Sequence, residues 1–354
     1  MRTTLCDRLG IEVPIIQAPM AGGWTTPALV AAVSEAGGFG MLAGARITRA
    51  QLEEQITETR RRTGRPFGVN FQIAPTTPTE DDDPGALALL AEMRRRLGLS
   101  ATPTPVPPSV PVEEAIDLAL ASGVRVISLA MGSPEPWVAQ VHAGGGVLMA
   151  AATTVAEAEA AEQAGADMIV AQGAEAGGHR STFVADPFDA VPLVGTIALV
   201  PAVVDAVRVP VVAAGGIMDG RGVVAALALG AVGVQLGTRF LLATESATPP
   251  SYRRRLLQAV ETETVVTDVY TGRFARGLRN GFLRLYEEKT ARPLGWPRQG
   301  AAALDIFRAS QAADGEWTPL FAGQGVRIGR REQPAAEIVR ELIEEARRVR
   351  DRLP

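Results

Sequence analysis

Short apolar runs alternate with longer amphipathic segments along the first 245 residues of the chain. The runs have the length of buried strands, while the segments between them have helix signals, such as a cap at Thr25 or Thr26 ahead of Pro27 and a cap at Thr154. The predicted strands are residues 13–18, 39–43, 66–72, 124–129, 146–151, 167–171, 210–214 and 232–235. The predicted helices begin near residues 27, 48, 112, 134, 154, 196 and 222. Strands and helices that alternate through short connections are typical of a parallel sheet.

Eight strand–helix units favour an α/β fold of the (β/α)8 TIM barrel type. A doubly wound nucleotide-binding sheet would need a G-x-G-x-x-G loop after its first strand, with an acidic residue further on. The loop after the first predicted strand reads APMAGG at residues 18–23 instead. The barrel is therefore the better prediction.

Two stretches interrupt the repeat. Residues 74–111 are rich in proline, carry an acidic cluster at 80–83, and include a predicted helix at 86–97; they form either a lid or a poorly ordered excursion. Residues 246–333, with a predicted helix at 252–261 and a strand at 264–270, are expected to form a smaller α+β domain over the active-site face. The amphipathic helix at 334–354 would complete the barrel formed by residues 1–245.

Composition narrows the class of protein. A hydrophobic content of 47% in 354 residues is enough for a sizeable core, and a net charge of -4 spread along the chain favours neither nucleic acid nor a membrane surface as a partner. The single cysteine, Cys6, excludes an internal disulfide, and with only two histidines it builds no zinc cluster. Residues 1–10 have no signal-peptide pattern, and no apolar run reaches the ~18 residues of a membrane span. We expect a soluble, cytoplasmic protein without a bound metal.

One stretch, DMIVAQGAEAGGHR at residues 167–180, combines a buried strand with a glycine-rich loop and a histidine. The strand ends at Gln172, and glycine lets the following backbone turn tightly and approach a ligand. His179 can exchange protons near neutral pH, because the ordinary pKa of histidine is ~6.5. The alternative is a loop histidine that makes one hydrogen bond and has no chemical role.

Two further glycine loops follow the seventh and eighth strands, where TIM barrels often bind a phosphate. These are Gly215-Gly216 and Gly237-Thr238, the second at the expected start of a short helix, whose backbone N–H groups favour an anion. Asn70 and Gln172, at the ends of two strands, could serve a ring system across the barrel mouth. The arrangement describes a flavin mononucleotide (FMN) site. A sugar phosphate fits the same physics, and glycines that merely close tight turns are the structural alternative.

In these motifs the sequence resembles the nitronate monooxygenase family, formerly called 2-nitropropane dioxygenases, and within it the bacterial type with a catalytic histidine. The resemblance covers nearly the whole chain, and its most specific motif is the loop that ends at His179 and Arg180. The other matching motifs are QAPM (17–20), GVNF (68–71), AGGI (214–217), LGTRF (236–240) and AGQG (322–325). Together with the glycine loops described above, the resemblance implies that His179 is catalytic. It also implies FMN contacts at Ala18, Pro19, Met20, Asn70, Gln172, Gly177, Gly178, Gly215, Gly216, Gln235, Leu236, Gly237 and Thr238.

The resemblance implies oxidative denitrification, in which an alkyl nitronate reduces FMN, O2 reoxidises it, and a carbonyl compound and nitrite are formed. His179 would either remove the α-proton of a neutral nitroalkane or, as a cation, hold the nitronate. We favour the cationic role for nitronate turnover, because that substrate already lacks the proton. Ser181 and the pair Ala130-Met131 depart from the family pattern near the expected substrate cavity, so substrate identity is open. The sequence is compatible with a homodimer but does not fix the oligomeric state.

Other functions compete with this one. A flavin-dependent enoyl-acyl carrier protein reductase shares the barrel and much of the histidine loop, but needs NAD(P)H. The Gln172 loop and residues 322–325 favour the monooxygenase. A sugar-phosphate isomerase would need a glutamate or lysine base at a strand end, for which Glu175 is the nearby candidate, and a non-catalytic flavin-binding protein would need no base.

Overall fold

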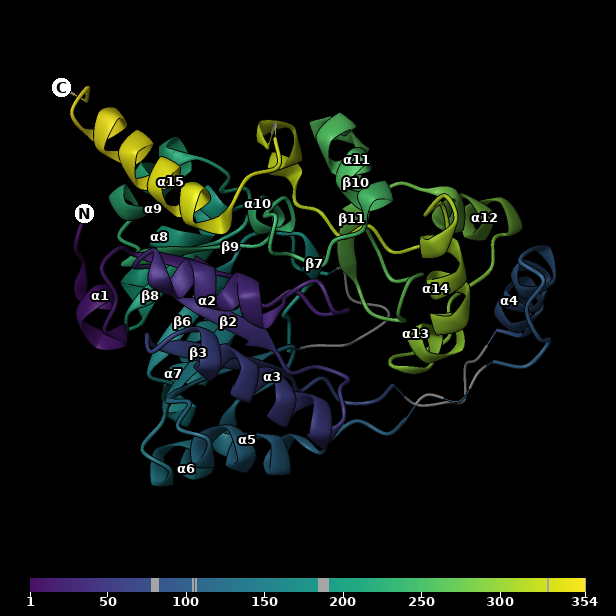
Figure 1. Cartoon of the computed structure of the whole chain (residues 1–354), viewed down its shortest axis with the longest axis horizontal. Helices are drawn as coiled ribbons and strands as arrows, with labels where there is room; N and C mark the ends of the chain where they lie inside the picture. The colour runs from purple at the N-terminus through teal and green to yellow at the C-terminus, as the bar shows by residue number, and fades with distance from the viewer. Residues whose placement is uncertain (78–82, 104, 106, 184–190, 330, 354) are drawn as a thin grey trace.

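The computed structural model describes residues 1–77, 83–103, 105, 107–183, 191–329 and 331–353. Its main feature is a parallel sheet of eight strands in the order β1-β9-β8-β6-β5-β4-β3-β2, with helices around it (Figure 1). The strands are β1 (Ile15–Gln17), β2 (Gly40–Ala43), β3 (Phe67–Gln72), β4 (Val126–Ala130), β5 (Val147–Ala152), β6 (Met168–Gln172), β8 (Val211–Ala214) and β9 (Gly233–Leu236).

The two edges of this sheet meet and close it into a barrel. Ile16 of β1 forms a parallel bridge with Phe39, the residue before β2. The N–H of Gln17 donates to the carbonyl of Phe39 at 2.9 Å, and the N–H of Phe39 donates to the carbonyl of Ile15 at 2.8 Å. The (β/α)8 TIM barrel predicted from the alternating pattern is therefore confirmed, with each predicted strand within a few residues of its expected position.

Helices cover the outside of the barrel. Thr26 caps α2 with its side chain, Pro27 occupies the first turn, and Thr154 caps α7, all as expected from the sequence. The C-terminal helix α15 packs against α9 and α2. The barrel helices are α2 (Pro27–Glu35), α3 (Arg49–Arg62), α5 (Val112–Ala121), α6 (Glu135–Ala143), α7 (Val155–Ala164), α8 (Thr196–Ala206), α9 (Gly220–Ala228), α10 (Thr238–Leu241) and α15 (Ala335–Arg350).

A short helix that the sequence pattern did not predict, α1 (Thr4–Leu9), closes one end of the barrel. Leu5, Cys6 and Leu9 are buried in one cluster with inward-facing strand residues such as Met149 and Met168. The Thr3 hydroxyl donates to the carbonyl of Val232, which precedes β9. Because α1 seals the end where strands begin, ligand access is left to the end where they finish, as is usual in barrels.

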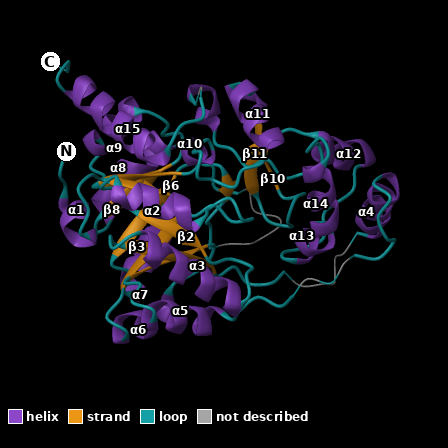
Figure 2. Cartoon of the chain, viewed as in Figure 1, coloured by secondary structure: helices purple, strands orange, loops and turns teal. Residues whose placement is uncertain are grey.

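A second, three-stranded sheet lies beyond that open end, in the order β10-β11-β7 (Figure 2). Its strands are antiparallel, and the middle one pairs with both neighbours. β10 (Thr264–Thr267) and β11 (Ala275–Leu278) come from the C-terminal third, whereas β7 (Gly178–His179) belongs to the loop after β6. The helical elements near it are α11 (Pro250–Gln258), η1 (Glu261–Glu263), α12 (Gly281–Lys289), α13 (Arg298–Ala302), α14 (Leu304–Ala312) and η2 (Gln324–Ile328).

Helix α4 (Pro84–Arg96), from the proline-rich stretch, packs on α12 and α14 at the far side of this second unit (Figure 1). Arg94 forms a buried ion pair with Asp305 at 3.0 Å. Most of the predicted acidic cluster lies outside the described residues; its last member, Asp83, caps α4. The division at residue 245 stays a prediction, and the positions of α4 and β7 show that the second unit draws on chain from outside 246–333.

Candidate active site

The register of the barrel brings the predicted site segments to one rim. Gln172 pairs with Ala214, Ala214 pairs with Gln235, and Gln17 pairs with Leu236, so the loops that follow β6, β8, β9 and β1 leave the sheet side by side. The rim thus contains Ala18, Pro19 and Met20 after β1, Gly177 and Gly178 after β6, Gly215 and Gly216 after β8, and Gly237 and Thr238 after β9. Gln172 and Leu236 are the last residues of β6 and β9, Gln235 directly precedes Leu236, and Asn70 lies in β3 across the barrel.

The loop after β8 requires glycine. Gly215 and Gly216 have φ values of 118° and 71°, a region that other residues rarely adopt. A Cβ on Gly216 would also lie 3.2 Å from the Cβ of Glu175. Beside this loop, Gly237 caps α10, whose first N–H groups have no acceptor within the helix. Two glycine loops thus follow the neighbouring strands β8 and β9, and their backbone N–H groups can serve an anion.

Residues 322–325, here called the strap, cross these loops from the second unit. The N–H of Gly323 donates to the Thr238 hydroxyl at 3.0 Å, and the N–H of Gln324 donates to the carbonyl of Glu175 at 2.9 Å. A Cβ on Gly325 would lie 2.7 Å from the carbonyl oxygen of Gly216. The strap therefore ties together the loops after β6, β8 and β9.

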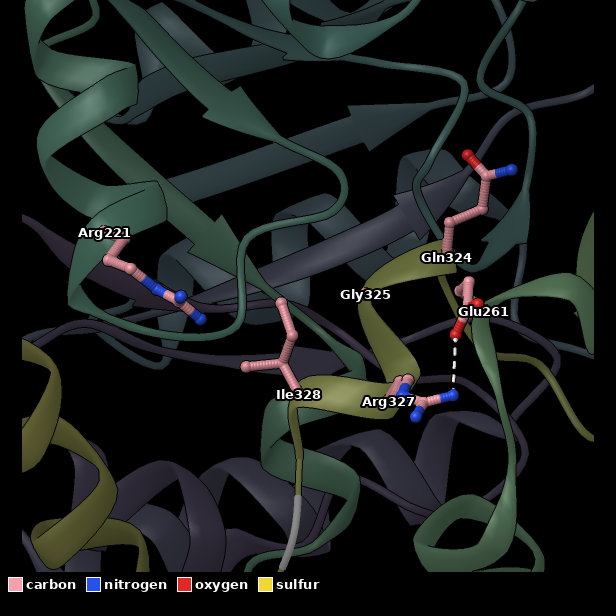
Figure 3. A pocket seen from close by; sticks show the side chains of 6 residues that line it. All are labelled: Arg221, Glu261, Gln324, Gly325, Arg327 and Ile328. Carbon is pink, nitrogen blue, oxygen red and sulfur yellow. Dashed lines mark hydrogen bonds and ion pairs between the residues drawn. The ribbon is translucent and has the colours of Figure 1, made fainter.

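A cavity of about 480 Å³ opens beside the strap, and Figure 3 shows the residues around it (Figure 3). Gln324 and Gly325 contribute to its wall, but none of the predicted site residues does. Its two guanidinium groups are paired, Arg327 with Glu261 at 3.3 Å and Arg221 with Asp219 at 2.5 Å. These pairs are mostly solvent-exposed, so the cavity has no unpaired charge to attract a ligand and is not the centre of the candidate site.

Side chains inside the barrel mouth include two buried amide oxygens without partners. The alternation of strand residues points Gln72 and Gln235 inward, and the Oε1 atom of each is buried and accepts no hydrogen bond from the described chain. Asn70, by contrast, donates from Nδ2 to the carbonyl and the hydroxyl of Ser128, at 3.1 and 3.0 Å. Since buried polar atoms are normally satisfied, the two orphaned oxygens fit a ligand that brings N–H donors into the mouth.

Gln172 holds the histidine loop. Its Nε2 donates to the carbonyl of His179 at 3.0 Å, and its Oε1 accepts from the N–H of Ser181 at 3.0 Å. Both ends of the amide are therefore engaged by the backbone on either side of Arg180. The sequence predicted Gln172 at the site, and the structure gives it this orienting contact.

His179 lies where the barrel and the second unit meet. Its backbone is in β7, with Ala275 of β11 opposite. The imidazole Nε2 is 2.8 Å from the Thr271 hydroxyl, and the ring packs edge-on to Trp296 and tilted against Phe321, with centroids 5.2 and 5.4 Å away. The second histidine, His142, is on the barrel surface with Asp167 as its partner at 2.9 Å.

The surroundings of His179 favour its neutral form. Burial, then the positive charges of Arg46 and Arg273, lower the pKa of His179 to about 3. Arg46 stacks over Trp296, with its Cζ 5.7 Å from the ring centroid. A cationic histidine was the role favoured from the sequence for nitronate turnover, and burial and the two arginines oppose that form. The ring is therefore unprotonated at neutral pH, the state in which a histidine can accept a proton.

Buried arginines shape the loop around the histidine. Arg180 donates to the carbonyls of Gly173, Gln172 and Pro192, at 2.7, 3.0 and 3.3 Å. Arg273 donates to the carbonyls of Met131 and Thr182, at 3.2 and 2.5 Å. Burial lowers the pKa of Arg180 to about 10 and that of Arg273 from its ordinary value, yet both stay protonated at neutral pH. Arg180 and Arg273 thus make the site rich in positive charge, and no carboxylate within the described part of the chain forms an ion pair with either of them.

Comparisons with known proteins agree with this geometry. The structure is similar to that of the nitroalkane oxidase of Streptomyces ansochromogenes, with a TM-score of 0.89 and 36% identity over 99% of this chain and 100% of that one. FabK from Thermotoga maritima is also similar, with a TM-score of 0.79 and 30% identity over 99% and 98% of the two chains. A probable nitronate monooxygenase of Staphylococcus saprophyticus is 38% identical over 99% of each chain.

These likenesses define a TIM-barrel oxidoreductase as the class of enzyme. The model of the nitronate monooxygenase family matches residues 2–345, and the chain belongs to that family. The family assignment drawn from the motifs is thereby confirmed. Within the described residues, no helix is both long and apolar enough to cross a membrane.

Several side chains at the site were not predicted from the sequence. Thr271, Arg273 and Trp296 come from the second unit, and Gln72 follows Asn70 on the same strand face. The alternation along β3 could have revealed Gln72, because residues 70 and 72 share a face. For the others the sequence offered no local signal, since their approach to His179 depends on long-range packing.

Proposed function

We propose that this enzyme is an FMN-dependent nitronate monooxygenase that oxidises alkyl nitronates with O2 to carbonyl compounds and nitrite. The observation that carries the proposal is the meeting of a neutral histidine with two backbone-lined glycine loops at one barrel rim. The strap joins them through its contacts to Thr238 and to the carbonyl of Glu175. FMN is proposed because these loops form one phosphate-sized site, without a second one for a pyrophosphate.

The residues present fit that cofactor. Gly216 and the first turn of α10 would hold the phosphate through backbone N–H groups, and the orphaned Oε1 atoms of Gln72 and Gln235 would accept from ring N–H groups. The proposed contacts remain those predicted from the sequence, with Gln72 added. Bound FMN would supply the redox chemistry, taking two electrons from the substrate and passing them to O2.

His179 would act on the substrate's proton. With its pKa lowered by burial, Arg46 and Arg273, the ring is neutral over the working range and can accept the α-proton of a nitroalkane. The resulting nitronate is an anion, and the charges of Arg46 and Arg273 that oppose protonation of the ring would favour it. Trp296 and Phe321 pack against the ring and keep water from one side of it. A nitronate supplied as such would need no base.

The first experiment asks what reduces the bound flavin. Under anaerobic conditions an alkyl nitronate should bleach the visible absorbance of the purified yellow protein, and readmitted O2 should restore it with release of nitrite. NADPH alone should leave the absorbance unchanged. Bleaching by NADPH and not by nitronate would instead establish the enoyl reductase alternative. Mass spectrometry of the released cofactor must find FMN, and FAD would count against the single phosphate site.

The second experiment tests the base. His179→Asn keeps a polar side chain but removes the titratable ring, so kcat/KM for a neutral nitroalkane should fall by roughly 10²–10⁴. For the matched, pre-formed nitronate it should fall much less, and FMN should stay bound. His142→Asn is the control, because the surface partner of that ring, Asp167, is remote from the site loops. Equal losses on both substrates would show that His179 is not a base.

Three finer points of the assignment also remain proposals. The substrates would be small nitronates or nitroalkanes together with O2, and the enzyme would be cytoplasmic. Light scattering of the flavin-loaded protein would distinguish the 37.2 kDa monomer from the proposed homodimer.

A further inference from the structure

The Thr271 hydroxyl is placed between the imidazole of His179 and a backbone carbonyl. It lies 2.8 Å from Nε2 of His179 and donates to the carbonyl of Arg273 at 3.3 Å. A carbonyl oxygen can only accept, so the hydroxyl proton is directed toward Arg273. The remaining lone pairs of the hydroxyl can then only accept from His179. Both contacts are hydrogen bonds at the same time only if Nε2 carries the ring proton.

This arrangement fixes the other ring nitrogen as well. In a neutral imidazole only one nitrogen is protonated, so Nδ1 of His179 carries the free lone pair. Nδ1 has no hydrogen-bond partner among the described residues. It is also not among the fully buried polar atoms that lack a partner, so it is not closed off from a ligand. It is the nitrogen that remains open to a ligand.

The charges around the ring keep it neutral, which is the condition for a tautomer choice. The groups that face His179 are the guanidinium groups of Arg46 and Arg273, the Thr271 hydroxyl, and the rings of Trp296 and Phe321. Both ionisable neighbours are positive, and no carboxylate of the described chain is within ion-pair distance of the ring. Selection between the two neutral tautomers is thus left to Thr271.

We propose that Thr271 is a positioning residue that holds His179 in the Nε2–H tautomer and makes Nδ1 the atom that accepts the substrate's α-proton. The inference rests on the proposed function, since it names the atom at which His179 acts as a base. It assigns no contact with substrate to Thr271 itself. Residues of this kind, which orient a functional histidine through a hydrogen bond, typically change activity 10–100-fold in metal sites, and we expect a similar range here.

Nuclear magnetic resonance can observe the tautomer directly, because the chain has only two histidines. Flavin-loaded enzyme labelled with ¹⁵N-histidine should give two ring systems, assigned by His179→Asn and His142→Asn. His179 should show a protonated Nε2 and an unprotonated Nδ1 at neutral pH. His142, whose Nε2 contacts the Asp167 carboxylate, is an internal reference for a protonated Nε2. A protonated Nδ1 on His179 would overturn the proposal.

Kinetics then tests whether the tautomer matters. Thr271→Val removes the hydroxyl with little change in shape, so Nε2–H loses its acceptor, and kcat/KM for a neutral nitroalkane should fall about 10–100-fold. Activity on the matched nitronate should fall much less, and Thr271→Ser should restore the nitroalkane rate and the wild-type tautomer. Thr267→Val is the matched control, because this buried threonine accepts from the N–H of Val269 and does not contact His179.

The outcomes separate this inference from the proposed function. If Thr271→Val leaves both the tautomer and the nitroalkane rate unchanged, or if Thr271→Ser fails to restore them, Thr271 does not position the ring. If the wild-type ring has the Nε2–H tautomer but no nitroalkane or nitronate is oxidised, the positioning role of Thr271 stands and the proposed function fails. Equal losses on nitroalkane and nitronate in Thr271→Val would overturn the assignment of Nδ1 as the base.

Discussion

Glu157 is a buried carboxylate that anchors the segment just after His179, and its replacement by glutamine gives a prediction whose size follows from the hydrogen bonds. One carboxylate oxygen accepts from the N–H and the hydroxyl of Thr153, at 2.6 and 2.7 Å. The other accepts from the Thr182 hydroxyl and the N–H of Phe183, at 2.7 and 2.6 Å. Four donors therefore converge on two oxygens, and a carboxylate is the side chain that can accept from all of them.

Glu157→Gln must leave one backbone donor unsatisfied. The two threonine hydroxyls can rotate to accept from a new NH2 group, but a backbone N–H cannot, and each oxygen of Glu157 serves one backbone N–H. An unsatisfied buried donor costs about 1–3 kcal/mol, and the remaining bonds change from charge-assisted to neutral. Removing a buried charge offsets part of the loss. We expect a net loss of roughly 2–4 kcal/mol.

Thermal unfolding of the flavin-loaded enzyme measures this loss. With an unfolding entropy of about 2.1 cal/mol/K per residue, a loss of that size lowers Tm by roughly 3–5 °C in a chain of 354 residues. Glu162→Gln is the matched control on the same helix, because a single oxygen of Glu162 accepts from the N–H groups of Arg208 and Val209. The amide retains such an oxygen, so Tm should change little. A Glu157→Gln variant as stable as the wild type would refute the reasoning.

Three further changes test other parts of the site. Gly216→Asp should give largely flavin-free protein by absorbance ratio, because it puts a negative charge in the proposed phosphate loop. Gly98→Asp is the control for backbone strain and should keep its flavin, because Gly98 has a nearly equal φ of 68° and lies in open space. Gly177→Ala should lower Tm and flavin retention, since its Cβ would lie 2.6 Å from strap backbone. Because burial, Arg46 and Arg273 lower the pKa of His179 to about 3, kcat/KM for a nitroalkane should persist below pH 6. Arg46→Gln removes one of these positive charges, so the acid limb of the pH–rate profile should move to higher pH. An acid limb at pH 6.5 in the wild type would contradict the lowered pKa of His179.

The barrel could be predicted from the sequence because each strand is a local apolar run with a local helix after it. The N-terminal helix α1 could not be predicted, because its six residues mix Leu5 and Leu9 with charged neighbours and form too few turns for a periodic signal. The predicted strand at 264–270 ends at Thr267 instead, and the residues that follow form the turn that carries Thr271. Local periodicity thus identifies buried segments better than it identifies where they end.

The residues of the candidate site also differ in how far the sequence predicts their positions. Residues that directly follow barrel strands, such as Gly216 and Gln172, could be placed from the sequence because the strand itself fixes their position. The two-residue strand β7 could not, because it exists only through its pairing with β11 almost a hundred positions further along the chain. The same is true of Thr271 and Trp296, whose contacts with His179 arise once that pairing forms.

The position of His179 depends on the register of this small sheet more than on the barrel. Side chains alternate across a strand, so a slip of one residue in the β7–β11 pairing would turn the imidazole to the opposite face, away from Thr271. Several contacts oppose such a slip: Gln172 holds the backbone on both sides of Arg180, and the N–H of Arg180 donates to the carbonyl of Phe274 at 2.9 Å. The barrel loops would hold the cofactor while the second unit sets the base. Substitutions around Thr271 and β11, away from the strap, should therefore change substrate preference while leaving flavin binding largely intact.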